Sequence, residues 1–116
     1  MKRGDIILVR VPHPSGARGK KRPAVVIQSD LYAGSVTSLV VAEITSNVTM
    51  ANDPASLFLD LSTAEGRATG ILHDSTVSCL LLYTVYSHAV DQVIGTLSPA
   101  MMQKLNDCLR AALELP

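Results

Sequence analysis

Short apolar runs separated by turn residues dominate the first three quarters of the chain, a pattern typical of β structure. The first run, residues 6–11 (IILVRV), begins after Gly4-Asp5 and ends at a cluster of prolines. The second run, residues 24–28 (AVVIQ), follows Pro23, which lacks a backbone N–H and therefore suits the first residue of a strand. The segment between them, residues 13–21, is polar and rich in Gly, Pro and Ser. We therefore predict a hairpin with a long, mobile loop.

Residues 38–46 (SLVVAEITS) predict a strand with two different faces, because successive side chains of a strand point in opposite directions. One face is apolar and consists of Val40, Ala42 and Ile44. The other begins apolar and ends polar, with Leu39, Val41, Glu43 and Thr45. This pattern is typical of a strand that is buried on both sides and presents polar groups only where it leaves the sheet.

The remaining elements are predicted from turn signals and from one helical pattern. We expect short strands at residues 57–61 and 90–96, one or two strands at 75–86, and a turn or a single helical turn at 62–70. Ser98 suits the N-cap of a helix and Pro99 its first position. An apolar stripe follows at three- and four-residue spacing, made of Met101, Met102, Leu105, Cys108, Leu109, Ala112 and Leu113. Together these elements predict one domain over residues 1–116, with a small, strongly bent sheet or barrel and a terminal helix.

The charges are unevenly distributed along the chain, although the formal net charge is zero. Residues 1–22 carry seven basic side chains and one acid, whereas the other 94 residues carry three basic and nine acidic groups. A net charge of zero by itself argues against nucleic-acid binding, where basic domains are expected. The cationic amino-terminal part leaves two interpretations open: a solvated terminus with a charged loop, or a surface that binds a polyanion.

Several classes of protein are disfavoured by the sequence. No stretch reaches the roughly 18 apolar residues of a membrane span, and the amino terminus lacks the features of a signal peptide, so we expect a cytoplasmic protein with no membrane contact. Cys79 and Cys108 show neither zinc-ligand spacing nor a disulfide framework. The histidines stand in separate segments, and the hydrolase and P-loop motifs are missing. We therefore expect neither a metal nor a cofactor.

The remaining polar groups suit a phosphate. Arg22 precedes a strand, hydroxyl groups end a neighbouring predicted strand, and a basic loop lies between. A guanidinium carries a permanent charge and a planar fork of donors for phosphate oxygens, and a hydroxyl adds another donor. In RNA the 2′-OH can itself attack the adjacent phosphorus, so the protein needs only to orient the attack, stabilise charge and move protons. The general base stays open between Glu43 and His73.

The chain resembles the MazF/PemK toxins of toxin–antitoxin systems. The resemblance is carried by GD before the first strand, KRPAVVIQSD at residues 21–30, EITSN at 43–47, DS at 74–75 and LSPAMMQKLNDCLRAAL at 97–113. It implies an α+β fold that is mainly β, an SH3-like small barrel of the CcdB/MazF type with a carboxy-terminal helix. It also implies a homodimer, a cognate antitoxin as partner, and metal-independent, sequence-specific cleavage of single-stranded RNA. The implied products are a 2′,3′-cyclic phosphate and a 5′-hydroxyl.

The resemblance also suggests roles for individual residues. Arg22 matches the family's catalytic arginine, and Thr45 matches the threonine at the end of the third strand. For RNA binding we expect Ser15, Lys20, Lys21, Ser46, Asn47, His73, Asp74 and Ser75.

The chain also departs from the family pattern. Several members carry an acid–glutamine pair followed by Arg-Thr in the strand after the DS position, where this chain has Leu80-Leu81 and then Tyr83-Thr84. Two alternatives therefore stay open. One is a CcdB-like toxin that binds a topoisomerase, which the absence of tryptophan disfavours, and the other is a degenerate nuclease that only binds its antitoxin.

Overall fold

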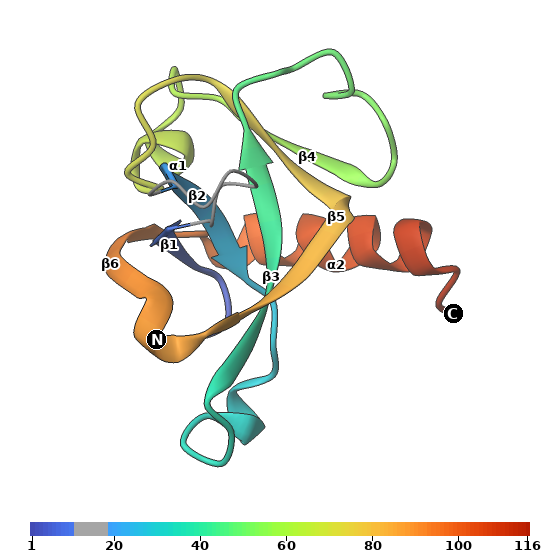
Figure 1. The fold of residues 1–116 in the computed structure, drawn as a ribbon. Coiled ribbons are helices and arrows are strands. Elements are labelled where there is room, and N and C mark those ends of the chain that lie inside the picture. Colours follow the sequence, from blue (N-terminus) through green and yellow to red (C-terminus); the bar gives the residue numbers. More distant parts are fainter. Residues whose placement is uncertain (11–18) are drawn as a thin grey trace.

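One six-stranded antiparallel sheet organises the computed structural model, which describes residues 1–10 and 19–116 (Figure 1). The strands are β1 (Asp5–Arg10), β2 (Lys21–Val26), β3 (Ser38–Thr45), β4 (Ser56–Leu59), β5 (Ser75–Tyr86) and β6 (Val90–Thr96). The helical elements are the 3-10 turns η1 (Asp30–Tyr32) and η2 (Ser87–Ala89), the short helix α1 (Ala64–Arg67) and the long helix α2 (Pro99–Leu113). The spatial order is β4-β5-β3-β2-β1-β6, and within the described residues the edge strands β4 and β6 do not pair with each other. The fold is therefore mixed α+β, as predicted, with an open bent sheet in place of a closed barrel.

The predicted hairpin is confirmed, but its second strand begins earlier than expected. β1 and β2 pair antiparallel from Ile6↔Val25 to Arg10↔Lys21, so Pro23 is the third residue of β2 and not the first. Because proline has no N–H to donate, Pro23 adds no ladder hydrogen bond towards β3. The pairing of β2 with β3 therefore starts only at Ala24↔Glu43. Residues 11–18 of the predicted loop lie outside the described part of the chain.

The segment predicted as one or two strands at residues 75–86 is a single strand, β5, with an irregularity in its middle. Opposite Ala42 and Glu43 of β3 lie Leu82 and Ser78, so three residues of β5 are skipped in the pairing. They include Leu80 and Leu81, which are exposed. A bulge of this kind lets a long strand bend around a small core.

The sheet is buried on both faces. One core lies between the sheet and α2 and includes Ile6, Val25, Ile44 and Leu105. The second contains Ile7, Val9, Ala24, Val26 and Val41. The two-faced pattern predicted for residues 38–46 is thus confirmed in β3, where Ala42 and Ile44 belong to the first core and Val41 to the second.

Helix α2 begins as predicted. The backbone N–H of Met101 donates a hydrogen bond to the Ser98 hydroxyl (3.1 Å), and Pro99 occupies the first helical position. Met101, Leu105 and Cys108 form its buried stripe. No helix in residues 1–10 or 19–116 is long and apolar enough to cross a membrane.

The segment between α1 and β5 is held against β6 by a close backbone approach. Gly70 has a φ of +76°, and a side chain added there would collide with the carbonyl group of Ile94. A hydrogen bond from the Thr96 N–H to the Ala68 carbonyl (3.2 Å) fastens the same segment. The absence of a Cβ at Gly70 thus brings residues 70–75 beside the sheet.

Replacing Gly70 by alanine should lower the free energy of unfolding more than replacing Gly34. Both glycines have positive φ, but an added Cβ at Gly34 meets nothing within 4 Å. Gly34→Ala should therefore cost only the backbone strain of about 1–2 kcal/mol, and Gly70→Ala that strain plus the collision. Urea unfolding of the two variants measures the difference. Equal losses would contradict the close approach.

The buried thiols should make stability depend on alkaline pH. Burial raises the pKa of Cys79 to about 12, with a further contribution from nearby Cys108. Because the unfolded thiol ionises first, near its ordinary pKa of about 8.5, the free energy of unfolding should be unaffected below that pH. It should then fall as the pH rises towards 12, by up to about 1.4 kcal/mol per pH unit for this group. Urea unfolding at several pH values should show a shallower fall for Cys79→Ala, and equal slopes would contradict the assignment.

Candidate functional site

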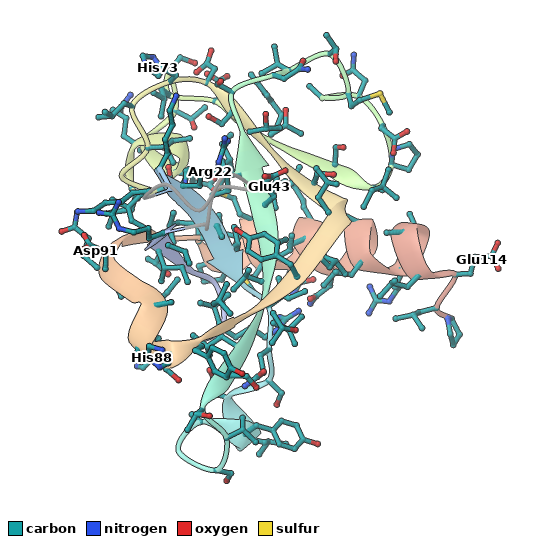
Figure 2. The ribbon with its side chains drawn as sticks, viewed as in Figure 1. Arg22, Glu43, His73, His88, Asp91 and Glu114 are labelled. Carbon is teal, nitrogen blue, oxygen red and sulfur yellow. The ribbon has the colours of Figure 1, made fainter. Side chains whose placement is uncertain are left out.

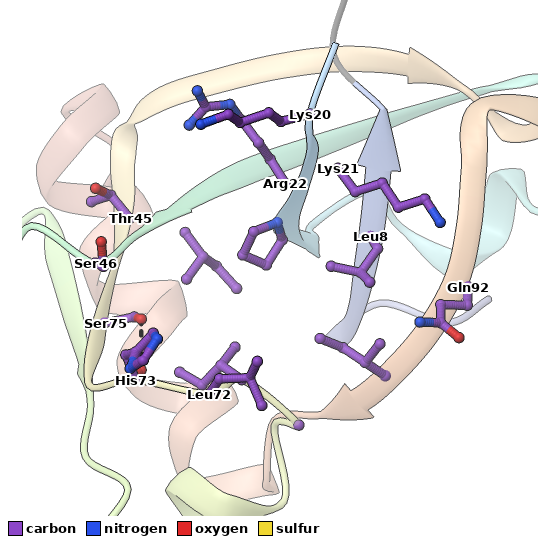
Figure 3. A pocket seen from close by; sticks show the side chains of 15 residues that line it. Leu8, Lys20, Lys21, Arg22, Thr45, Ser46, Leu72, His73, Ser75 and Gln92 are labelled. Atoms are coloured by element: carbon purple, nitrogen blue, oxygen red, sulfur yellow. Dashed lines mark hydrogen bonds between the residues drawn. The ribbon is translucent and has the colours of Figure 1, made fainter. Parts of the chain in front are cut away.

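A cavity of about 500 Å³ opens where β2 begins and β3 ends (Figure 3). Its walls come from the start of β2, the end of β3, the segment 70–75, β1 and β6. The lining residues are Leu8, Lys20, Lys21, Arg22, Pro23, Ile44, Thr45, Ser46, Gly70, Ile71, Leu72, His73, Ser75, Gln92 and Ile94. Seven of the ten residues selected from the sequence are therefore brought to one cavity.

The register of β2 against β3 explains why Arg22 and Thr45 meet. The two strands pair antiparallel at Val25↔Ala42 and Ala24↔Glu43. Continuing this register by two residues places Arg22 opposite Thr45, and opposite residues of antiparallel strands share a face of the sheet. Figure 3 shows both side chains on the same side of the cavity, with Lys20 beside Arg22. A guanidinium, an ammonium and a hydroxyl thus border one cavity.

Thr45 is oriented by the turn that follows β3. Its hydroxyl oxygen accepts a hydrogen bond from the Asn47 N–H (3.1 Å), which leaves the hydroxyl proton available as a donor. The Asn47 side chain in turn accepts from the Thr49 N–H (3.0 Å), so Asn47 shapes the turn and is not part of the cavity lining. The adjacent Ser46 is exposed and does line the cavity.

Asp74 and Ser75, the DS pair at the start of β5, make different contacts. Asp74 accepts a hydrogen bond from the Leu61 N–H (2.9 Å) and is not part of the lining, so it fastens the loop after β4. Ser75 donates to the carbonyl oxygen of His73 (2.8 Å), and both residues line the cavity. Asn47 and Asp74, which are expected to bind RNA, thus lie outside the cavity lining. Ser15 lies outside the described residues.

The two lysines differ in their surroundings. The ammonium group of Lys21 forms an ion pair with Asp91 (3.0 Å), and both side chains are about two-fifths exposed. Lys20 is also exposed and stands next to Arg22 (Figure 3). Because the charge of Lys21 is partly balanced by Asp91, Lys20 and Arg22 provide most of the positive potential at the cavity.

The two candidate bases also occupy different places. His73 lines the cavity, whereas Glu43 does not. Figure 2 shows Arg22 and Glu43 on neighbouring strands. His73 and His88 lie at opposite ends of the molecule, and His88 stacks on Tyr86.

Tyr83 stands at a position where the sequence departs from the family pattern. Its hydroxyl is buried and has no hydrogen-bond partner in the described residues. Burial raises the pKa of Tyr83, Glu43 raises it further, and Arg22 acts in the opposite direction, so the phenol lies near both charges. Sequence reasoning also missed Leu72 and Gln92, because only the pairing of distant segments brings them to the cavity.

The side chains that commonly bind metal ions are dispersed over the described residues. Within residues 1–10 and 19–116, no three His, Cys, Asp or Glu side chains lie together in a way that could hold a metal ion.

Comparisons with known proteins agree with one another. Residues 2–113 match the family described as PemK-like, MazF-like toxin of type II toxin–antitoxin system. Endoribonuclease MazF2 of Mycobacterium bovis is 31% identical over 115 residues, which cover 97% of this chain and 96% of that protein. Endoribonuclease MazF6 of Mycobacterium tuberculosis shows the same identity and coverage.

Solved structures show the same fold. A mycobacterial endoribonuclease in complex with its cognate antitoxin superposes with a TM-score of 0.81 at 16% identity, covering 100% of this chain and 97% of that one. The Mycobacterium tuberculosis toxin MazF-mt6 superposes with a TM-score of 0.77 at 20% identity, over 97% of this chain and 98% of that one. The likeness therefore extends over nearly the whole chain.

Proposed function

The chain belongs to the PemK-like, MazF-like toxins of type II toxin–antitoxin systems, and on this premise we propose that it is an endoribonuclease that cuts single-stranded RNA at the cavity beside Arg22. The observation that carries the proposal is the convergence of Arg22, Thr45 and Lys20 on one cavity wall. These side chains offer two permanent charges and a hydroxyl donor to a phosphate. The match over residues 2–113 also supports one domain for the whole chain.

In the proposed reaction the attacking group belongs to the substrate. The ribose 2′-oxygen forms a bond to the adjacent phosphorus, and the bond from phosphorus to the 5′-oxygen breaks. The products are a 2′,3′-cyclic phosphate and a 5′-hydroxyl. Arg22 stabilises the charge that develops on the non-bridging oxygens, and the Thr45 hydroxyl donates to one of them. This chemistry needs no metal, because the nucleophile is already held next to the phosphorus.

Two proton transfers complete the reaction. The 2′-OH must lose a proton, and the leaving 5′-oxygen must gain one. We assign the first transfer to His73, because its imidazole lines the cavity. Glu43 does not line the cavity, and we give it no part in the transfer. The leaving 5′-oxygen lies on the opposite side of the phosphorus in an in-line displacement, so in this proposal it takes its proton from solvent water.

The partners follow from the family and from the surface. We propose that a cognate antitoxin binds the chain, as one does in the mycobacterial complex with the same fold. We also propose a homodimer in the cytoplasm. Its support is the pair Leu80 and Leu81 on β5, which are 58% and 49% exposed. No observation favours topoisomerase binding, since the relatives at 31% identity are named endoribonucleases.

Removing the Arg22 guanidinium or the Thr45 hydroxyl should slow cleavage strongly without affecting the fold. Arg22→Ala and Thr45→Val should each lower the cleavage rate by about 10²–10³, because each removes a donor to the developing charge. Arg110→Ala serves as the matched control, since Arg110 lies on α2 and pairs with Asp107. Initial rates on a fluorescent single-stranded RNA, with chelator present, measure the effect.

The same assay decides between cleavage and mere binding. A wild-type protein that binds RNA but leaves it intact would indicate a degenerate nuclease, and unchanged rates for Arg22→Ala would refute the assignment of Arg22.

The salt dependence of RNA binding should identify the contribution of Lys20. Lys20→Ala should reduce the slope of log affinity against log salt by about 0.7, the value for one phosphate contact to a single strand. Lys21→Ala should change it less, because Lys21 is already paired with Asp91. Lys104→Ala on α2 is the control and should leave the slope unchanged. Fluorescence anisotropy of labelled RNA at several salt concentrations provides the measurement, and equal slopes for Lys20→Ala and Lys104→Ala would exclude Lys20 from the interface.

A further inference from the structure

The cavity has two chemically different walls. Lys20, Arg22 and Thr45 lie together on one side, whereas Leu8, Lys21 and Gln92 lie on the side towards β6 (Figure 3). On that side Lys21 is paired with Asp91. The lining also includes the apolar residues Pro23, Ile71, Leu72 and Ile94. An anionic phosphate gains nothing from contact with apolar side chains, so we expect a different part of the ligand to contact them.

We propose that these apolar side chains and Gln92 bind one nucleobase of the RNA next to the cleaved phosphate, with Gln92 contacting the polar edge of the base and Leu72 covering its face. The inference rests on the proposed function, because it takes the substrate to be RNA. A nucleobase combines two apolar faces with an edge of donors and acceptors, which matches apolar side chains that lie beside the Gln92 amide. A cavity of about 500 Å³ is large enough for such a ligand.

Leu72 is placed to contact a ligand rather than the protein core. Its side chain is 85% exposed, although it follows the half-buried Ile71 and borders the cavity. The close approach of Gly70 to Ile94 fixes the position of this segment beside β6. An apolar side chain held on the rim of a cavity gains burial when a base packs against it.

Gln92 is aimed at the cavity by the irregular pairing of β1 with β6. It lies opposite Leu8, and the register shifts between Leu8 and Val9 and again between Ile6 and Ile7. Such bulges re-aim side chains at the edges of sheets. Within the described residues, no hydrogen bond engages the Gln92 amide, which offers one donor side and one acceptor. The neighbouring Asp91 is neutralised by Lys21, which keeps negative charge away from the RNA.

The chemistry of the amide makes the proposal testable. An amide presents one donor side and one acceptor, whereas a carboxylate presents only acceptors. Gln92→Glu should therefore favour bases that carry an exposed amino group, which are guanine, adenine and cytosine, over uracil at the contacted position. The expected change in relative cleavage between sites is roughly tenfold to a hundredfold, the range of one good base contact.

The experiment maps every cut site on one long unstructured transcript. Wild type, Gln92→Glu and Leu72→Ser are compared with two controls, Gln103→Glu on α2 and Leu31→Ser on η1, which make the same chemical changes outside the cavity lining. Gln92→Glu should redistribute the cuts among sites, Leu72→Ser should weaken the preference at the same position, and the controls should match wild type.

The outcomes separate the two proposals. If wild type leaves the transcript intact, the proposed function fails and the inference fails with it. If wild type cuts and Gln92→Glu lowers all sites by one common factor, or none, the nuclease stands and the base contact is overturned.

Discussion

The site depends on one structural constraint, the antiparallel register between β2 and β3. Because Ala24 pairs with Glu43, Arg22 falls opposite Thr45 at the end of the sheet. A shift of one residue would send the arginine to the other face and separate it from the threonine. Pro23 adds to this constraint, since it limits the backbone of Arg22 to extended conformations and ends the ladder to β3 where the cavity begins. The strands that hold the arginine are buried on both faces, which gives the charged group a rigid support.

The opposite wall of the cavity depends on a different device, the packing of residues 68–75 against β6. Gly70 permits the approach, and Asp74 and Ser75 fasten the segment through hydrogen bonds to backbone groups. His73, Leu72 and Ile71 are therefore presented by a segment that is held at both ends. Charged and neutral side chains reach one cavity from elements that are far apart in the chain. This arrangement lets the phosphate group and a base of one ligand be bound side by side.

In the structure, some of the basic side chains near the amino terminus are bonded to other groups, whereas others face the cavity. The amino-terminal excess of basic residues left open whether they form a solvated terminus or a surface that binds a polyanion. In the fold, Lys21 is balanced by Asp91, and Arg3 is bonded to the Ile27 carbonyl (2.9 Å) and to Asn106 (2.7 Å). Lys20 and Arg22 remain directed at the cavity. A neutral protein can therefore present a local site for an anion, because screening in water limits the reach of distant charges.

The sequence by itself determined the strands, the amphipathic helix with its Ser98-Pro99 start, and the place of the RP motif near the start of a strand, because these depend on local periodicity, capping and turn chemistry. Part of the site followed from it as well, since Arg22, Thr45 and His73 lie at predicted ends of strands. The open edge of the sheet, the bulge in β5 and the part played by Gln92 were decided only in the tertiary structure. Each results from pairing between segments that are distant in the chain, as in the register of Leu8 with Gln92. The same holds for Asn47 and Asp74, whose side chains accept hydrogen bonds from the backbone N–H groups of Thr49 and Leu61, a choice of partner that local sequence leaves open.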